Sequence, residues 1–306
     1  MVKNAHPPPM TWELAVFLKI FGGYILAPIV FRLLGNVPTR ERIQRILLQY
    51  VWAFVFALAV AAVMGLTLSK DLWPIFGIGV LMPLTVFFQW RAIAYSVSRT
   101  ALFLEGGAIL PLALSSLFLG EWLVFATINA LVVGFVLVAL GIALHAWHDL
   151  KNRSGESVLP LAFYGNALGC MILSALATFL QNVWAKSGVE VPGFLIAWYG
   201  GALCGSLLFF LATRHLPRTK TTLAPVTTQV LIFLAAVSIV GNLGFMFIAF
   251  TLVEQTVALP IMSVGGLLGP ALVGMLIFKE WQTIRGWAWC YFGLAFMGAL
   301  VMTLAR

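Results

Sequence analysis

The sequence has few charged residues, few histidines and few cysteines. Only 9% of its 306 residues are Asp, Glu, Lys or Arg, whereas 62% are hydrophobic. The three cysteines and four histidines form no CxxC pair, no HExxH motif and no cluster with metal-ligand spacing. We therefore expect no metal site, no cofactor and no enzymatic activity. Because so apolar a chain cannot be buried inside a soluble globule of this length, its solvent is lipid.

Ten apolar stretches are long enough to cross a membrane, which takes about 20 helical residues. The alternating polarity of an outer-membrane barrel is absent, so the stretches are predicted to be helices. We predict an all-α membrane protein with ten transmembrane helices in two inverted five-helix repeats. The predicted spans are 13–34, 47–68, 73–95, 100–119, 123–147, 160–184, 194–213, 228–251, 257–278 and 284–304.

The pattern of residues 94–141 recurs later in the chain at a constant offset of 159 residues. One folding unit is therefore used twice, and because each unit has five spans, the second enters the membrane from the opposite side. We assign 13–147 to the first repeat, 148–159 to the connecting loop and 160–304 to the second repeat. The matched positions are Gly106-Gly107 with Gly265-Gly266, Pro111 with Pro270, Glu121-Trp122 with Glu280-Trp281, and Gly134 with Gly293.

The net charge of +8 indicates membrane topology and not nucleic-acid binding, because the basic residues are unevenly distributed. Twelve of the 18 Lys and Arg residues lie in loops that follow odd-numbered spans, and four lie on the opposite face. By the positive-inside rule, both termini are predicted to lie outside the cytoplasm. We expect an integral, multi-pass protein of a bacterial inner membrane.

The stretch from 92 to 145 resembles an EamA domain. Small residues end the third span, the fourth bears a proline, and a Gly-Glu turn precedes the fifth; residues 262–281 repeat this pattern. From about 13 to 304 the chain is similar to ten-helix members of the drug/metabolite transporter (DMT) superfamily. Three features depart from that family. Lys279 stands where the family usually places Gly before Glu, and the first two spans match the family pattern poorly. The family generally has both termini in the cytoplasm, whereas the charge distribution predicts the reverse.

The resemblance implies a central cavity that opens to one side at a time, lined by spans 1, 3, 4, 6, 8 and 9, with spans 5 and 10 peripheral. Gly and Pro at corresponding places in two halves also indicate a transport site, because proline removes a backbone donor and lets a helix bend. Alternatively, the glycines only allow close helix packing. The candidate helix-break residues are Gly106, Gly107, Pro111, Gly265, Gly266 and Pro270.

Arg91 and Glu105 are ionisable residues inside adjacent spans, where each costs on the order of 2.5 to 3.5 kcal/mol. If spans 3 and 4 turn near 97–98, the two lie at equal depth, and we predict an ion pair. Their counterparts in the second repeat, Phe250 and Val264, are uncharged, so specificity could reside in this asymmetry. In the alternative, Arg91 extends to the interface and Glu105 neutralises it.

Span 6 carries a stripe of polar residues about four positions apart, which predicts an inward face. Hydrogen bonds between helices, worth about 0.6 kcal/mol each, are the alternative role for any one of them. Glu105 is the one carboxylate well inside a span, hence the candidate proton carrier if transport is coupled. The stripe comprises Asn166, Cys170, Ser174, Thr178, Gln181 and Asn182. The candidate substrate-binding residues are Lys19, Tyr24, Gln89, Trp90, Arg91, Glu105, Asn166, Ser174, Asn242 and Ser263.

Two further groups of charges lie at span ends. Glu121 and Glu280 each open a turn into the following helix, where a carboxylate complements the positive helix terminus, so we assign them a structural role. Arg40, Arg42 and Arg45 begin a helix and are predicted to meet anionic lipid headgroups.

These features predict a secondary transporter or exporter of small polar or amphipathic metabolites, such as amino acids, that works by alternating access. Its partners are a small-molecule substrate, the lipid bilayer and, if transport is coupled, protons; no nucleic acid is expected. The alternatives are a flippase for lipid-linked precursors, with a lateral opening and a basic site near Arg91, or a non-transporting scaffold without a cavity at mid-depth. The sequence leaves direction, driving ion and oligomeric state open.

Overall fold

Helices make up all the regular structure in the described part of the chain. The computed structural model describes residues 10–65, 72–121, 128–151, 159–216, 225–282 and 286–304. Within these ranges there is no strand. Eight helices are long and apolar enough to cross a membrane, and the apolar stretches Val132–His148 and Trp289–Leu304 are shorter. An all-α membrane protein is therefore confirmed.

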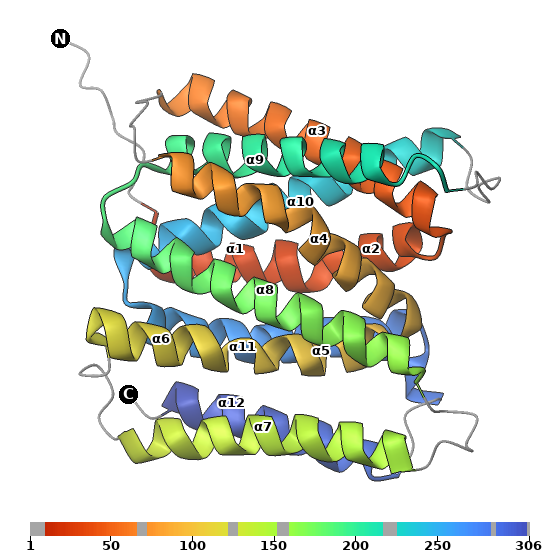
Figure 1. Ribbon diagram of the computed structural model, residues 1–306. Helices are drawn as coiled ribbons and strands as arrows, with labels where there is room; N and C mark the ends of the chain where they lie inside the picture. Colours follow the sequence, from red (N-terminus) through yellow and green to blue (C-terminus); the bar gives the residue numbers. More distant parts are fainter. Residues whose placement is uncertain are drawn as a thin grey trace.

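The helices lie side by side and run from one end of the bundle to the other (Figure 1). The elements before the middle of the chain are α1 (Trp12–Lys19), a π-helical segment η1 (Ile20–Leu26), α2 (Ala27–Gly35), α3 (Thr39–Met64), α4 (Leu72–Tyr95), α5 (Val97–Gly106), α6 (Ile109–Leu119) and α7 (Ile128–Lys151). Those after it are α8 (Leu161–Lys186), α9 (Val191–Ala212), α10 (Pro225–Leu252), α11 (Gln255–Leu272), the π-helical η3 (Val273–Ile277), the 3-10 turn η4 (Glu280–Gln282) and α12 (Ala288–Leu304).

The first membrane-crossing helix contains a π-helical segment in its middle. Pro28 has no backbone N–H, so the carbonyl of Tyr24 lacks its usual α-helical donor. The N–H of Ala27 instead donates to the carbonyl of Gly22, five residues back. Such π segments often mark functional sites, and this one brings its backbone against α11, where a Cβ at Gly269 would lie 2.8 Å from the Tyr24 carbonyl oxygen.

The helix break at the predicted fourth span has no equivalent at the ninth. α5 ends at Gly106, the N–H of Gly107 donates to the Leu104 carbonyl at 2.9 Å, and α6 begins at Ile109. In contrast, α11 continues through Gly265 and Gly266 and past Pro270 before it becomes the π-helical η3. A break at the second glycine pair is therefore wrong. The irregularity begins instead three residues beyond Pro270, whose missing N–H leaves the Gly266 carbonyl without its α-helical donor.

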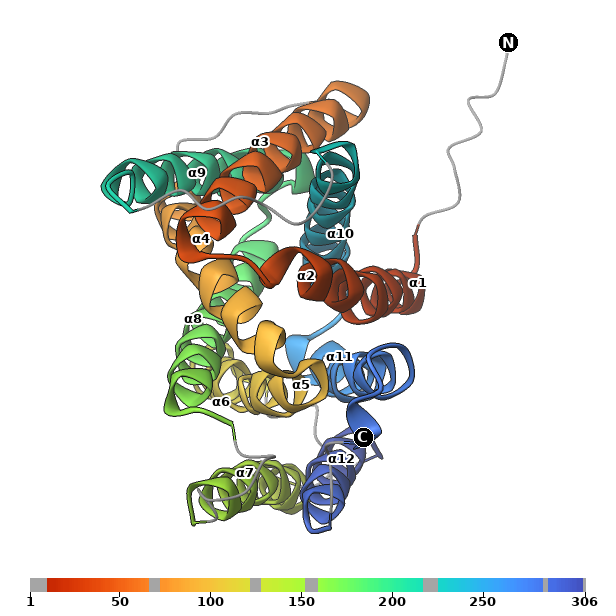
Figure 2. The ribbon, with the colours of Figure 1, turned by 90° about the vertical axis from the view of Figure 1, so that its right-hand side faces the viewer.

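α7 and α12 lie together at one edge of the bundle and pack mainly against each other (Figure 2). They approach each other closely at two glycines: a Cβ at Gly134 would lie 2.7 Å from the Gly298 carbonyl oxygen, and a Cβ at Gly298 would lie 2.6 Å from that of Gly134. Small residues allow helices to approach closely in lipid, where packing drives association. The remaining helices surround the centre of the molecule.

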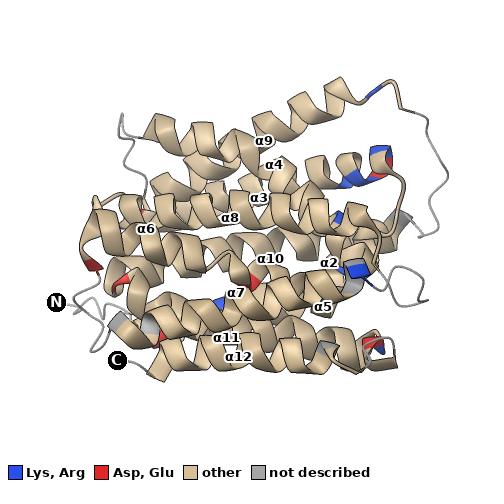
Figure 3. Ribbon diagram, turned by 60° about the horizontal axis from the view of Figure 1, so that its bottom comes forward, with Lys and Arg blue, Asp and Glu red and all other residues tan. Residues whose placement is uncertain are grey.

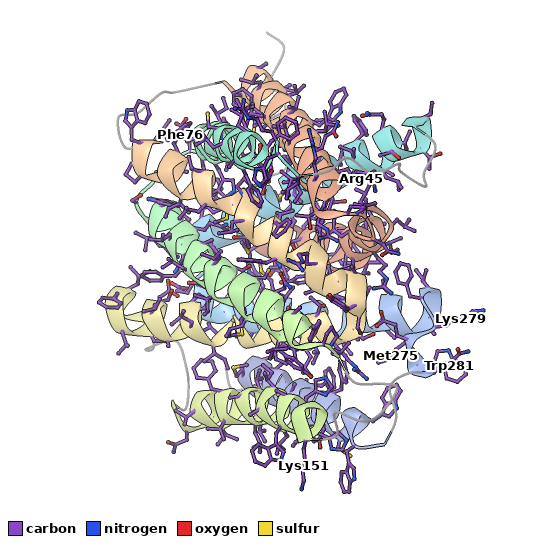
Figure 4. All side chains as sticks on the ribbon, turned by 45° about the vertical axis from the view of Figure 1, so that its right-hand side comes forward. Arg45, Phe76, Lys151, Met275, Lys279 and Trp281 are labelled. Carbon is purple, nitrogen blue, oxygen red and sulfur yellow. The ribbon has the colours of Figure 1, made fainter. Side chains whose placement is uncertain are left out.

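The arginines at the start of α3 do not form the headgroup-binding site expected from the sequence. Arg42 and Arg45 are buried, and Figure 4 shows Arg45 where α3 approaches the end of α2. Arg42 donates to the Gly35 carbonyl through Nη2 at 2.7 Å, and Arg45 donates to the Leu34 carbonyl at 3.0 Å. Arg40 donates to the Leu216 carbonyl. These guanidinium groups satisfy backbone carbonyls, including those left over at a helix C-terminus.

Candidate functional site

A cavity of about 240 Å³ lies among the inner helices of the bundle. The π-helical segment, α4, α5, α6, α8, α10 and α11 contribute most of its lining, together with parts of α1, α2, α3 and α9. Neither α7 nor α12 contributes a lining residue. The polar and charged residues of the lining include Lys19, Tyr24, Thr85, Gln89, Thr100, Glu105, Ser174, Thr178, Gln181, Ser238 and Asn242.

Lys19 is the cation of this cavity. Its side chain is only 2% exposed, and its ammonium nitrogen lies 3.5 Å from the centre of the Tyr24 ring. A cation over an aromatic face is held by the ring quadrupole, more strongly where water is excluded. The π-helical backbone places Tyr24 in position to hold Lys19 within the bundle.

Glu105 is the carboxylate of the same cavity. It comes from the last turn of α5, just before the helix break, and lies against Gly266 of α11. A Cβ at Gly266 would overlap Glu105 Oε1 and would lie 3.0 Å from Cζ of Tyr24. Lys19 interacts electrostatically with this carboxylate. The glycine is thus required for space, which explains the residue type without a break in α11.

The two opposite charges share the cavity without a direct salt bridge. Among the described residues, the structure has no salt bridge between Lys19 and Glu105, although the two interact electrostatically. Buried charges are costly unless they are paired or do work. Both groups therefore keep donor and acceptor positions that a bound molecule can use.

Polar atoms with unused hydrogen-bonding capacity line the same space. Thr85 Oγ1, Gln181 Oε1 and Asn242 Oδ1 are buried and have no hydrogen-bond partner within the described ranges. Asn242 lies directly over Gly23 of the π-helical segment, where a Cβ would overlap its side-chain oxygen. Since buried polar groups normally have partners, these atoms are candidates for contact with a polar ligand.

The ion pair predicted between Arg91 and Glu105 is wrong. Arg91 lies with its guanidinium carbon 5.7 Å from the centre of the Phe87 ring, on its own helix, and does not line the cavity. Two side chains at equal depth on a helical hairpin do not necessarily face each other, because the direction of the side chain around the helix axis rotates by about 100° per residue. The partner of Glu105 in the cavity is Lys19, from the first helix.

The other predicted residues fall into two groups. Tyr24, Gln89, Ser174 and Asn242 line the cavity, and so do the helix-break candidates Gly107, Pro111, Gly266 and Pro270. Trp90 is fully buried beside Phe31, with ring centres 5.6 Å apart, and is absent from the lining. Asn166 donates to the Ala162 carbonyl one turn back. Ser263 lies behind the lining, next to Glu105.

Residues missed by the sequence reasoning include Thr85, Thr100 and Tyr199, all of which line the cavity. Thr85 precedes Gln89 by four positions, one helical turn, so the same spacing argument that identified the stripe of α8 applied to it. Nothing comparable was available for Tyr199, whose hydroxyl donates to the Ile239 carbonyl at 2.7 Å.

Glu280 caps the N-terminus of α5 at one end of the cavity. Its Oε1 accepts from the Val97 N–H at 2.7 Å, and its Oε2 accepts from the Ser98 N–H and the Ser96 hydroxyl, both at 2.9 Å. These donors form the N-terminus of α5. The neighbours of Glu280, Lys279 and Trp281, are exposed and point away from the bundle (Figure 4).

Glu121 does the same at the other end. Its Oε2 accepts from the Thr256 N–H in the first turn of α11 at 3.2 Å, and its Oε1 accepts from Asn182 Nδ2 of α8 at 2.8 Å. Asn182 also donates to Ser115 Oγ at 3.2 Å. Each carboxylate therefore complements a helix terminus, that of α5 for Glu280 and that of α11 for Glu121. The turns into the following helices, residues 122–127 and 283–285, lie outside the described residues. Glu121 follows the end of α6 and caps the start of α11, and Glu280 follows the end of η3 and caps the start of α5. The segments α5–α6 and α11–η3 therefore run antiparallel.

Comparison with known proteins shows the fold and not the family. No protein-family model matches the sequence, and no curated protein matches it. A solved structure described as "Crystal structure of protein" is similar over 96% of this chain and 97% of its own, with a TM-score of 0.64 at 16% identity. The likeness covers both halves of the bundle, so the arrangement of the helices as one unit has a precedent in a solved protein.

Proposed function

We propose that this protein is a secondary transporter of small polar metabolites, built as two inverted five-helix repeats of the DMT type. The antiparallel run of α5–α6 and α11–η3 supports the inversion. These are the segments that match in sequence, and Val97 and Thr256, whose N–H groups the two glutamates cap, are themselves matched at the 159-residue offset. A twofold axis in the membrane plane relates segments in this way.

The packing of the other helices supports the same symmetry. α4 packs against α9 and α8, and its counterpart by order, α10, packs against α3 and α1. α5 packs against α11, and α7 packs against α12. Each of these contacts has its counterpart after exchange of the halves. Counting α1–η1–α2 as one span, and α5–α6 and α11–η3 likewise, gives ten spans.

One observation carries the proposed function: Lys19 and Glu105 face one cavity where two helices are irregular. Irregular backbone and ionisable side chains in a membrane protein occur where they line a water-filled site. A molecule with both an anionic and a cationic group would complement the two charges. Amino acids and related compounds are therefore the proposed substrates.

The size of the cavity favours this substrate class over the alternatives. A water molecule occupies about 30 Å³ in the liquid, so 240 Å³ corresponds to about eight waters. This volume is below the roughly 300 to 1,000 Å³ of pockets for drug-sized ligands. It is also much too small for the volume of a lipid-linked precursor. A scaffold gains nothing from two charges at mid-depth, whose insertion costs several kcal/mol.

The distribution of charge supports an orientation in a bacterial inner membrane. Lys and Arg gather at the end of the bundle where α2 meets α3, away from the chain termini (Figure 3). By the positive-inside rule this end faces the cytoplasm, and the ends of the chain lie outside. Glu105 is the proposed proton carrier if transport is coupled, because it is the carboxylate that lines the cavity.

The test is uptake by purified protein in proteoliposomes, screened over amino acids, sugars, organic cations and organic anions, with and without a pH gradient. We expect saturable uptake of one or more amino acids. Lys19→Met and Glu105→Gln should abolish it, whereas Arg91→Met, which removes a charge outside the cavity, should retain it. Folded protein that carries none of the four classes in either direction would refute the proposal.

A further inference from the structure

The two carboxylate caps are the most symmetric polar feature of the described structure. Glu121 caps α11 at Thr256, and Glu280 caps α5 at Val97. Both carboxylates are almost fully buried, at 6% and 7% exposure. A carboxylate that accepts backbone N–H groups at a helix N-terminus benefits both from the charge-assisted bonds and from the helix dipole. Each cap therefore ties the end of one central helix to the start of the other.

The cavity lies between these caps. Along α5 and α6 its lining runs from Val97 to Pro111, and along α11 it runs from Leu259 to Pro270. The Glu280 cap closes onto the first residue of the α5 lining, and the Glu121 cap lies beyond the last residue of the α6 lining. The central pair of helices thus has one cap at each end of the cavity.

We propose that Glu121 and Glu280 are reciprocal latches, each of which holds one end of the cavity closed. Opening toward the Glu280 end separates η4 from the start of α5, and opening toward the Glu121 end separates the end of α6 from the start of α11. This inference rests on the proposed transport function. In the present structure both latches are closed, so the cavity is held between two formed caps.

The backbone just before each glutamate has the same unusual conformation. Gly120 has a φ of 70°, and its counterpart Lys279 has a φ of 56°. A left-handed residue turns the chain so that the next carboxylate points back toward the neighbouring helix. Lys279 adopts this conformation despite its Cβ, which disfavours it. The left-handed conformation that directs the glutamate toward the neighbouring helix therefore occurs in both repeats.

The partners of the latches differ, which predicts different sensitivity to substitution. Each carboxylate oxygen of Glu280 accepts a hydrogen bond from a backbone N–H group, Oε1 from Val97 and Oε2 from Ser98. A glutamine has only one oxygen, so its NH₂ group would face one of these N–H donors and that hydrogen bond would be lost. Glu121 meets the side-chain amide of Asn182, whose Oδ1 is unpartnered in the described ranges. That amide can rotate and accept from a glutamine. Glu280→Gln should therefore open its latch more than Glu121→Gln opens the other.

The experiment measures from which side the cavity can be reached. Cys170, Cys204 and Cys290 are replaced by Ala or Ser, and Ala177→Cys of α8 places one thiol in the cavity lining. A membrane-impermeant maleimide is added to one side of proteoliposomes with oriented protein, and in a second set to the other side. We expect Glu280→Gln to raise the labelling rate about tenfold from the Glu280 side only, and Glu121→Gln to raise it by less from the opposite side only.

Two substitutions serve as matched controls. Glu254→Gln makes the same chemical change beside the start of α11, where the Glu254 side chain forms no capping bond. Ser98→Ala removes a hydroxyl that donates to the Ala271 carbonyl at 3.4 Å but keeps the N–H that Glu280 accepts. Both should label at the unsubstituted rate. Thermal unfolding of every variant shows whether a change in labelling reflects unfolding.

The outcomes separate the latches from the transport proposal. If both glutamine variants label from one side, or if both lose stability without a change in labelling, the glutamates are helix caps and the latch proposal is overturned. If labelling changes sides as expected but no substrate class is taken up, the latches stand and the proposed transport function fails.

Discussion

The ends of the bundle and its middle obey different rules. At the ends, Glu121 and Glu280 occupy matched positions and cap matched helices. In the middle, Glu105 has no charged counterpart, because the 159-residue offset places Val264 there. The helix that corresponds by order to the one carrying Lys19 is α8, and it has no Lys or Arg before its last residue, Lys186. A mechanism that opens alternately to two sides needs equivalent ends, whereas a bound metabolite has no twofold symmetry. On the proposed transport function, the symmetric residues maintain the architecture and the asymmetric ones recognise the substrate.

The largest effect is expected from loss of either charge in the middle. Lys19→Met and Glu105→Gln each leave the other charge without its opposite in the cavity, and truncating one partner of a buried pair typically costs 2 to 5 kcal/mol. We expect uptake in proteoliposomes to fall by about 100-fold or more. Arg91→Met is the control and should stay within about threefold. Equal losses in all three variants would remove the distinction between cavity and surroundings.

A smaller but still large effect is expected from Gly266→Ala. The new Cβ would overlap Glu105 Oε1, so the carboxylate must move away from the cavity position it now holds. We predict a fall in uptake of roughly 10- to 100-fold, since small displacements of binding groups are costly. Gly77→Ala is the matched control, because a Cβ there meets nothing within 4 Å. Normal uptake by Gly266→Ala would mean that Glu105 need not stay where it is.

An intermediate effect is expected at the ends of the bundle. Ser96→Ala removes the hydroxyl that donates to Glu280 and accepts from the Arg99 N–H, but it leaves the bonds from the Val97 and Ser98 N–H groups to Glu280. Loss of one hydrogen bond to a charged group costs about 1.5 to 3 kcal/mol. Thermal unfolding in detergent should show a lower midpoint, whereas substrate affinity should be unchanged. A change in affinity without a change in stability would assign this end of the bundle to binding.

The smallest effect is expected from Lys279→Gly. Glycine adopts the left-handed conformation of this position without the penalty of a Cβ, so the substitution should stabilise the protein by about 1 kcal/mol. The unfolding midpoint should rise by a few degrees. Lys186→Gly, at the last residue of α8, is the opposite case. It removes the bond from Lys186 Nζ to the Val253 carbonyl at 3.4 Å and should destabilise the protein. Destabilisation by Lys279→Gly would show that the lysine side chain itself supports the turn.

Features that depend on local pattern could be predicted from the sequence. Apolar length predicted the membrane-spanning helices, and the four-residue spacing of Ser174 and Thr178 placed both on a face that lines the cavity. Lys19 and Tyr24 were recognisable as polar residues beside Gly22-Gly23 in the first span. A helix break near Gly107 followed from the glycine pair and Pro111.

Features that depend on which helices are neighbours could not be predicted in the same way. The sequence gives no rotation for α4, so Arg91 was paired with Glu105, although it lies over Phe87. The partner of Glu105 is 86 positions earlier in the chain, on the first helix. Likewise, helix-dipole reasoning identified the chemistry of Glu280 but not that its target is the start of α5.

The most direct test of the central claim uses the unsubstituted protein and a series of competitors. In proteoliposomes loaded with a transported amino acid, exchange is measured against that amino acid, its decarboxylated amine and its deaminated acid. If Lys19 and Glu105 hold the two charges of one substrate, only molecules with both charges should compete at concentrations near half-saturation. Equal competition by the amine, or by the acid, would contradict the account.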